Sequence, residues 1–186
     1  MANEFCQSTI SADMGEFQSK FLKHIPDRGT ILDLGCGSGR DSKAFLTTGY
    51  RVIAVDGSQE LCKLASANIG QPVICSTFQE YTPTEKFDGI WACASLLHLD
   101  EEEMKNVILK LNQYLNSSGY WYISLKCENF EGIRNGRYFK SMTEDTFLKF
   151  INQFSSLTLK EFYITSDVRP NREDEHWINA FLQKNL

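Results

Sequence analysis

The chain has 186 residues, of which 42% are hydrophobic and 12% aromatic, so it can bury one sizeable core. A formal net charge of −5 argues against general affinity for polyanions, and nucleic acid is therefore disfavoured as a partner. No run approaches the roughly 20 apolar residues of a membrane span, and the first residues lack the pattern of a secretion signal, so we expect a cytoplasmic protein without membrane contact.

The first half of the chain predicts helices alternating with strands. Asp13 and Glu16 have the spacing of a capping box, and Pro26 can stop the helix that follows. Short apolar runs bounded by glycine or proline are typical of buried strands. We expect helices over about 13–25, 40–49 and 58–70, and strands at 30–34, 51–56 and 73–75.

The second half continues this alternation. Its clearest helix follows Asp100, which can cap it together with Glu103. We expect strands at 89–94, 120–125, 157–164 and 176–182, helices over 101–115 and after a cap at 141–144, and a loop rich in glycine and arginine after the strand at 120–125. Strands joined by helices require right-handed crossovers. The order therefore predicts an α/β fold, a doubly wound and mainly parallel sheet with helices on both faces.

The turn after the first strand is the candidate ligand site. Ligands of such sheets bind beyond the carboxyl ends of the strands, where the winding reverses. Gly35, Gly37 and Gly39 permit positive φ and close approach of the backbone, and the helix that follows offers free N–H groups. Asp56, which ends the second strand, can accept hydrogen bonds from a ribose. The alternative is ordinary turn chemistry, with Asp56 starting a turn at Gly57.

A nicotinamide dehydrogenase would use the same turn with the spacing Gly-x-Gly-x-x-Gly. Counted from Gly35, the third glycine would be residue 40, which is Arg40, so the spacing does not fit. Asp33 adds an anion that would repel a pyrophosphate and could attract an ammonium group. An amino-acid nucleoside is therefore predicted rather than a dinucleotide.

At this point the motifs resemble those of class I S-adenosylmethionine-dependent methyltransferases, whose first motif is an acidic residue followed by Gly-x-Gly-x-Gly. The matching segments are 31–39, Asp56, 87–88 and 96–98, and the chain is similar to a small bacterial subgroup of the tellurite-resistance type. The resemblance implies one Rossmann-like methyltransferase domain over 1–186, with the helix at about 13–25 as part of a lid. It also implies seven strands, the last antiparallel and inserted between the fifth and sixth. Relatives usually carry a tyrosine before the segment that matches residues 2–5, and a chain beginning at Met1 would lack that part of the lid.

The resemblance implies S-adenosylmethionine as cofactor and S-adenosylhomocysteine as product. It places the methionine part at the glycine turn, the ribose at Asp56 and the adenine beside residues 57, 58 and 78. The family often has an acidic residue after the third strand, whereas 75–78 here read Cys-Ser-Thr-Phe, so a hydroxyl or a backbone carbonyl must substitute. The expected cofactor-binding residues are Asp33, Gly35, Gly37, Gly39, Asp56, Gly57, Ser58, Thr77, Phe78 and Ala94.

Methyl transfer from a sulfonium needs alignment, exclusion of water and, for some acceptors, removal of a proton. His98 follows the fourth strand and is the candidate acid or base, the alternative being a loop histidine that orders the cap at Asp100. Arg137, Arg169 and Arg172 could clamp an acidic acceptor, or could simply pair with neighbouring carboxylates.

Several signatures of methyltransferases that act on larger acceptors are absent, which favours a small and possibly acidic acceptor. The alternatives are methylation of RNA or protein, and a non-catalytic S-adenosylmethionine-binding regulatory module. The six cysteines show no Cys-x-x-Cys spacing, which predicts reduced thiols and no metal site. We expect a monomer or a weak dimer.

Overall fold

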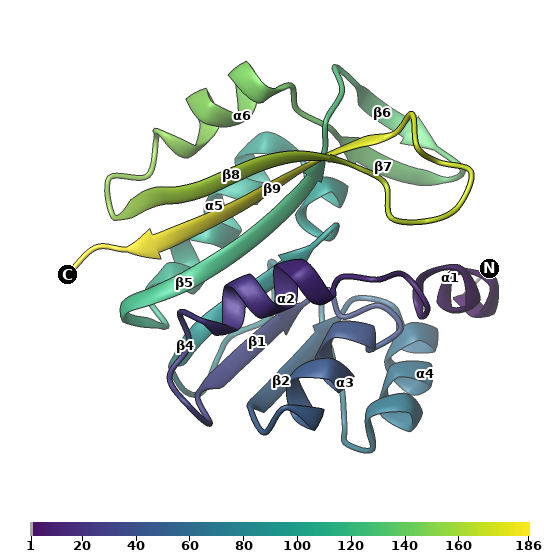
Figure 1. Cartoon of the computed structure of the whole chain (residues 1–186), viewed down its shortest axis with the longest axis vertical. Coiled ribbons are helices and arrows are strands. Elements are labelled where there is room, and N and C mark those ends of the chain that lie inside the picture. The colour runs from purple at the N-terminus through teal and green to yellow at the C-terminus, as the bar shows by residue number, and fades with distance from the viewer. Residues whose placement is uncertain (1) are drawn as a thin grey trace.

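A seven-stranded sheet runs through the molecule, and the computed structural model describes the chain from residue 2 to residue 186 (Figure 1). The strands of this sheet are β1 (Thr30–Leu34), β2 (Arg51–Asp56), β3 (Ile74–Cys75), β4 (Phe87–Cys93), β5 (Leu115–Lys126), β8 (Leu157–Ser166) and β9 (His176–Lys184). Their order is β3-β2-β1-β4-β5-β9-β8. Strands β1 to β5 are parallel, and β9 is antiparallel to both of its neighbours. The predicted sheet is confirmed, including the antiparallel last strand between β5 and β8.

Helices cover both faces of this sheet. They are α1 (Ala2–Thr9), α2 (Gly15–Leu22), α3 (Arg40–Thr47), α4 (Gln59–Ile69), α5 (Glu101–Asn112) and α6 (Glu144–Ile151), with a short 3-10 helix η1 (Leu96–His98). Successive side chains of a strand point to opposite faces. In β1, Ile31 therefore packs with residues of α2 and α3, whereas Leu32 packs with residues of α5 and α6.

Aromatic packing anchors α2 to its face of the sheet. The Trp91 ring stacks on Tyr122 with centroids 3.8 Å apart, and its edges meet Phe21 of α2 and Phe45 of α3 at 5.2 and 5.3 Å. The helix expected over 13–25 is shorter at both ends. Asp13 accepts a hydrogen bond from the Gly15 N–H rather than closing a capping box, and the residues just before Pro26 form turns instead of helix.

The other predicted caps differ in outcome. Ser58 accepts the Leu61 N–H at the start of α4, and Asp100 forms the expected capping box with Glu103 at the start of α5. The cap of α6 is Thr143 rather than Ser141, because the helix begins at residue 144 and the Thr143 hydroxyl accepts the N–H of Thr146. These caps are local devices that satisfy the free N–H groups of a first turn.

Three features were not predicted. They are helix α1, the short helix η1, and a hairpin of β6 (Glu131–Arg134) and β7 (Arg137–Lys140), where the sequence predicts only a loop. The turn of the hairpin is Asn135-Gly136, and both residues have positive φ, of 51° and 74°. Asn-Gly is a strong signal for a two-residue hairpin turn, so the loop expectation was wrong for a reason visible in the sequence.

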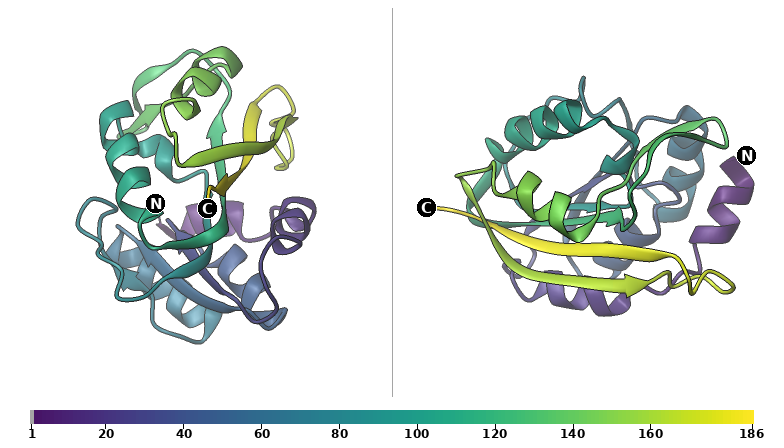
Figure 2. Two further views of the ribbon diagram at one scale, coloured as in Figure 1. Left: turned by 90° about the vertical axis from the view of Figure 1, so that its left-hand side faces the viewer. Right: turned by 90° about the horizontal axis from the view of Figure 1, so that it is seen from above.

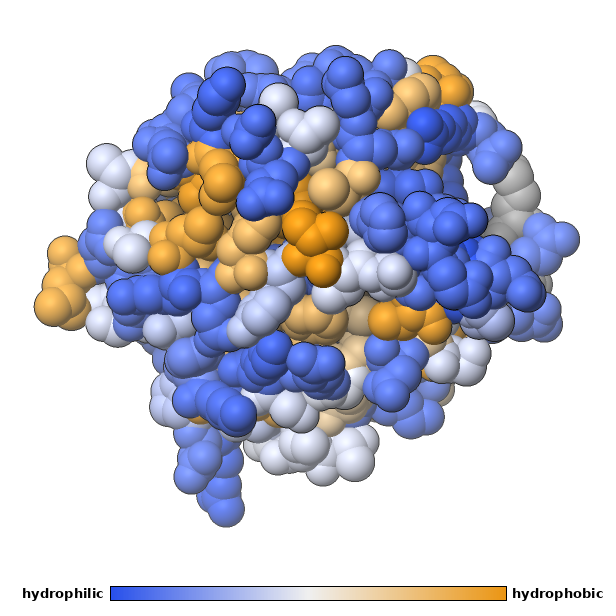
Figure 3. All heavy atoms as spheres, turned by 45° about the horizontal axis from the view of Figure 1, so that its top comes forward, coloured by the Kyte–Doolittle hydropathy of each residue, from blue (hydrophilic) through white to orange (hydrophobic). Residues whose placement is uncertain are grey.

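Several elements outside the seven-stranded sheet lie near the carboxyl ends of its parallel strands. Figures 1 and 2 show α1, the β6–β7 hairpin and the β8–β9 connection at the same end of the molecule. Apolar side chains also gather on the face where α6 and β8 come forward, at a distance from that end (Figure 3). Across residues 2–186, none of the helices combines the length and apolar character of a membrane span.

Candidate active site

A cavity of about 620 Å³ opens at the carboxyl ends of the strands, within the size range of pockets that hold small molecules. Its lining comes from the glycine turn after β1, the end of β2, the segments after β3 and β4, the ends of β5 and β8, and the start of β9. The β6–β7 hairpin, the β8–β9 connection and the start of α2 complete the wall. The predicted residues that line it are Gly35, Gly37, Asp56, Gly57, Ser58, Thr77, Phe78, Ala94, His98, Arg137, Arg169 and Arg172.

The glycine turn is shaped by positive φ angles and held by backbone hydrogen bonds. Gly35 has φ +82°, and its N–H donates to the Val55 carbonyl at 2.8 Å. A Cβ on Gly35 would lie 2.4 Å from the Ser95 Cβ and 3.0 Å from the Phe78 Cζ. The turn therefore requires glycine here for both conformation and space.

Asp56 joins the turn to the start of α4. Its Oδ2 accepts the Gly37 N–H and its Oδ1 accepts the Ser58 N–H, both at 2.9 Å. The carboxyl is 8% exposed, and burial raises its pKa while the two N–H groups oppose that rise. A carboxylate has about four acceptor positions, so each oxygen retains one for a ligand in the cavity. The two neighbouring hydroxyls of a ribose could donate hydrogen bonds to these two free acceptor positions.

The segment after β3 also lines the cavity, through residues 77–79. Lys110 of α5 fixes it by donating from Nζ to the carbonyls of Phe78, Gln79 and Tyr81 at 2.8–3.0 Å. The Thr77 hydroxyl, a candidate substitute for the missing acidic residue, donates to Glu80. That hydroxyl is therefore already engaged within its own segment.

Asp33 and Gly39 do not line the cavity. Asp33 is 2% exposed and accepts a hydrogen bond of 2.6 Å from the Ser42 hydroxyl beneath α3. Burial, followed by the charge of Asp41, raises the pKa of Asp33 far above its usual range. Gly39, with φ +75°, forms the cap of α3 and packs against Ile69. Both residues therefore contact α3 and lie outside the cavity.

Arg40 and Asp41 line the cavity, whereas Asp33, the acidic residue that the sequence predicted there, does not. Asp41 accepts hydrogen bonds from Trp91 Nε1 at 2.9 Å and Gln18 Nε2 at 2.7 Å, in addition to the Arg40 guanidinium. Arg40 also donates to the Thr9 carbonyl, which ties α1 to the turn. The distant partners of Asp41 lie 23 and 50 residues away, so sequence spacing could not reveal this cluster.

The floor of the cavity lies at the end of β4. Ala94 has φ +51°, a conformation that costs energy for a residue with a side chain, and its N–H donates to the Ser124 hydroxyl at 2.9 Å. The Ser95 hydroxyl is buried, lines the cavity and has no hydrogen-bond partner among the residues described. A buried hydroxyl without a partner is costly, which makes a ligand a natural partner for it.

His98 is fixed in one neutral tautomer. Its Nδ1 lies 2.8 Å from the Tyr138 carbonyl, which can only accept, so Nδ1 carries the proton. Nε2 of the neutral ring is then a free base. Burial lowers the pKa of His98, which favours this neutral form, and the ring packs edge-on against Phe139 with centroids 4.7 Å apart. The unpredicted hairpin therefore supplies the contacts that orient His98.

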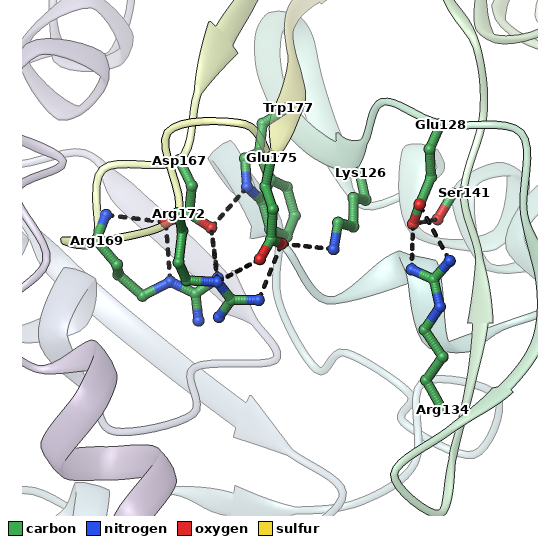
Figure 4. A network of polar contacts seen from close by, with 9 residues as sticks. All are labelled: Lys126, Glu128, Arg134, Ser141, Asp167, Arg169, Arg172, Glu175 and Trp177. Carbon is green, nitrogen blue, oxygen red and sulfur yellow. Dashed lines mark hydrogen bonds and ion pairs between the residues drawn. The ribbon is translucent and has the colours of Figure 1, made fainter.

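Most arginines near the cavity are paired, as the alternative interpretation anticipated. Figure 4 shows Arg169 hydrogen-bonded to Asp167 and Arg172 hydrogen-bonded to Glu175. Lys126 also pairs with Glu175. Asp167 also accepts the Trp177 Nε1–H at 3.0 Å. Arg134 forms a separate pair with Glu128, beside Ser141. Arg137 lines the cavity with its guanidinium 5.7 Å from the Phe139 ring centroid.

Residues 31–119 match the family described as "Methyltransferase domain". An uncharacterized methyltransferase of Geobacillus thermodenitrificans is 23% identical over 172 residues, which cover 89% of this chain and 78% of that protein. Among solved structures, a Burkholderia thailandensis 1,6-didemethyltoxoflavin-N1-methyltransferase with bound S-adenosylhomocysteine has a TM-score of 0.78 at 20% identity, covering 99% and 83% of the two chains. TehB from Haemophilus influenzae has a TM-score of 0.73 at 16% identity, covering 99% of this chain and 67% of TehB.

Proposed function

We propose that this chain is a class I S-adenosylmethionine-dependent methyltransferase that transfers the methyl group to a small, acidic acceptor bound at the hairpin end of the cavity. The functional unit extends beyond the matched residues 31–119. Phe17, Arg169 and Trp177 all line the same cavity and lie outside that range. We therefore treat the chain as one methyltransferase domain, acting in the cytoplasm.

The pocket around Asp56 fits the donor. Asp56 would accept the ribose hydroxyls, and the turn from Gly35 to Gly37 would lie against the methionine part. Gly57, Ser58 and Phe78 would enclose the adenine. S-adenosylmethionine supplies an activated methyl group on a sulfonium, whose thioether leaves without protonation. The protein must then orient the acceptor, exclude water and, where needed, remove a proton.

Cations dominate the acceptor end of the cavity. Four of the basic residues that line it pair with only three carboxylates, Asp167, Glu175 and Glu128, and a fifth basic residue, Arg137, lines it as well. The basic residues are Lys126, Arg134, Arg137, Arg169 and Arg172. Because the whole chain carries a net charge of −5, this local excess of positive charge favours an acidic acceptor. The aromatic rings of Phe139 and Trp177 add an apolar wall suited to a compact molecule.

His98 would act as the base for acceptors that must lose a proton. The observation that carries this role is the hydrogen bond from Nδ1 to the Tyr138 carbonyl, since it leaves Nε2 unprotonated. Burial keeps the pKa of His98 below its usual 6.5, so the ring is neutral at physiological pH. Ala94 and Ser95, on the strained segment between β4 and η1, would set the distance between acceptor and donor.

Replacing His98 with asparagine should lower kcat by about 100-fold or more, because a positioned general base contributes roughly 10²–10⁴. The amide can still donate to the Tyr138 carbonyl, so the affinity for S-adenosylhomocysteine should change less than threefold. The wild-type rate should fall as the pH drops through the lowered pKa of His98, since protonation blocks Nε2. The variant should lack this acidic limb. Equal kcat and pH profiles in the two proteins would contradict the role of His98.

The acceptor class is tested with radiolabelled S-adenosylmethionine and fractionated cell extract. We expect label in an anionic small-molecule fraction that binds to an anion exchanger. Label in RNA or in protein would favour a macromolecular acceptor instead. Tight binding of the cofactor with no labelled fraction would favour a non-catalytic regulatory module.

A further inference from the structure

Two cysteines meet behind the nucleoside end of the cavity. Cys75 ends the edge strand β3 and pairs in register with Asp56 of β2. Cys62 lies in α4, and its Sγ is 3.3 Å from the Asp56 carbonyl oxygen and 4.0 Å from the Ile74 carbonyl oxygen. Because the Ile74 carbonyl belongs to the peptide bond that leads into Cys75, the Cys62 sulfur lies directly at the Cys75 backbone. Paired residues of neighbouring strands project to the same face of a sheet, so the Cys75 side chain shares the face of Asp56.

The two thiols differ in accessibility. Cys75 is exposed on the edge strand, whereas Cys62 is 5% exposed in the core side of α4. An exposed cysteine beside a buried second cysteine is the arrangement in which a first oxidation is followed by closure to a disulfide. Cys36 is the competing partner for Cys62, because it is also buried.

We propose that Cys62 and Cys75 form a reversible disulfide when the protein meets a peroxide. The Cys75 thiolate attacks one peroxide oxygen, the O–O bond breaks, and one water leaves as the sulfenic acid forms. The Cys62 sulfur then attacks the Cys75 sulfur, the S–O bond breaks and a second water leaves. Two thiols are oxidised and one hydrogen peroxide is reduced to two waters, and a dithiol reductant reverses the change.

This disulfide would act on the cofactor pocket through Asp56. Oxidation removes the S–H group that donates to the Asp56 carbonyl, which also accepts the Ser76 N–H at 3.0 Å. It also ties the first turns of α4 to the segment after β3. Ser58, which caps α4, and Phe78, which follows β3, both line the nucleoside pocket. We therefore expect oxidised protein to bind S-adenosylhomocysteine at least threefold more weakly, with full recovery on reduction.

The test begins with wild-type protein treated with one equivalent of hydrogen peroxide. Thiol titration should show the loss of two thiols per chain, and peptide mass spectrometry should show residues 62 and 75 linked within one chain. Cys62→Ser should instead accumulate a sulfenic acid at Cys75, trapped by dimedone. Cys127→Ser is the matched control and should behave like wild type, because that thiol lies away from the pair.

These readouts do not depend on methyl transfer, so the disulfide and the proposed function can fail separately. A 36–62 linkage, a disulfide between chains, or oxidation of Cys75 to sulfinic acid without a linkage would overturn the proposal. An unchanged affinity for S-adenosylhomocysteine in fully oxidised protein would contradict the coupling to the pocket.

Discussion

Replacing Asp56 with alanine should weaken binding of S-adenosylhomocysteine by about 100-fold or more. A hydrogen bond to a charged group contributes roughly 1.5–3 kcal/mol, and two such bonds to the ribose would be lost. Each factor of ten in affinity corresponds to about 1.4 kcal/mol. The variant should also be less stable by about 1–2 kcal/mol, since the N–H groups of Gly37 and Ser58 lose their acceptor. Equilibrium binding of radiolabelled ligand and chemical denaturation measure the two effects.

The ligand provides the control for this variant. A 2′,3′-dideoxy analogue of S-adenosylhomocysteine lacks both hydroxyls, so it should bind wild type and Asp56→Ala with similar affinity. If the analogue lost as much affinity as the parent compound on this substitution, Asp56 would be acting only through the shape of the turn. The role assigned to its carboxylate as a ribose acceptor would then be wrong.

Replacing Gly35 with alanine should destabilise the fold and remove ligand binding. The new Cβ would meet the Ser95 Cβ at 2.4 Å, and the residue would keep a φ of +82° that disfavours any side chain. Positive φ costs about 1–2 kcal/mol, and overpacking adds about 1–3 kcal/mol. Gly49→Ala is the matched control, because Gly49 has φ +92° with nothing within 4 Å of the added Cβ. It should lose only the conformational part, without effect on binding.

A second substitution separates the cost of steric overlap at position 35 from the cost of its positive φ. Ser95→Gly removes the atoms at 2.4 and 3.2 Å but leaves the Phe78 Cζ at 3.0 Å. Gly35→Ala combined with Ser95→Gly should therefore recover part of the free energy of unfolding lost by Gly35→Ala alone. Equal destabilisation by Gly35→Ala and Gly49→Ala would show that close packing of the turn against Ser95 plays no part.

The elements that the sequence predicted well depend on local signals. Asp100 and Glu103 cap α5 through hydrogen bonds between residues three apart, so their spacing was sufficient. The order of strands and helices, together with the rule on crossovers, was enough for the parallel part of the sheet. The place of the antiparallel last strand came from the family resemblance, because no short-range pattern specifies it.

The candidate site was predictable in outline because the strands end at a common edge. That rule places Gly35, Asp56 and His98 around one cavity. It says less about which way a side chain points. Asp33 shares the face of Ile31 by strand alternation, so it lies beneath α3 rather than in the cavity. The hydrogen bonds of Asp41 depend on tertiary packing, which no local pattern contains.

The most direct test of the account is calorimetric titration of the wild-type chain with S-adenosylhomocysteine, with NADH titrated in parallel. Binding of one S-adenosylhomocysteine per chain with a dissociation constant in the micromolar range or below, and no heat with NADH, is the predicted result. Absence of heat with S-adenosylhomocysteine, or saturable binding of NADH, would contradict the assignment of the cavity to an adenosyl amino acid.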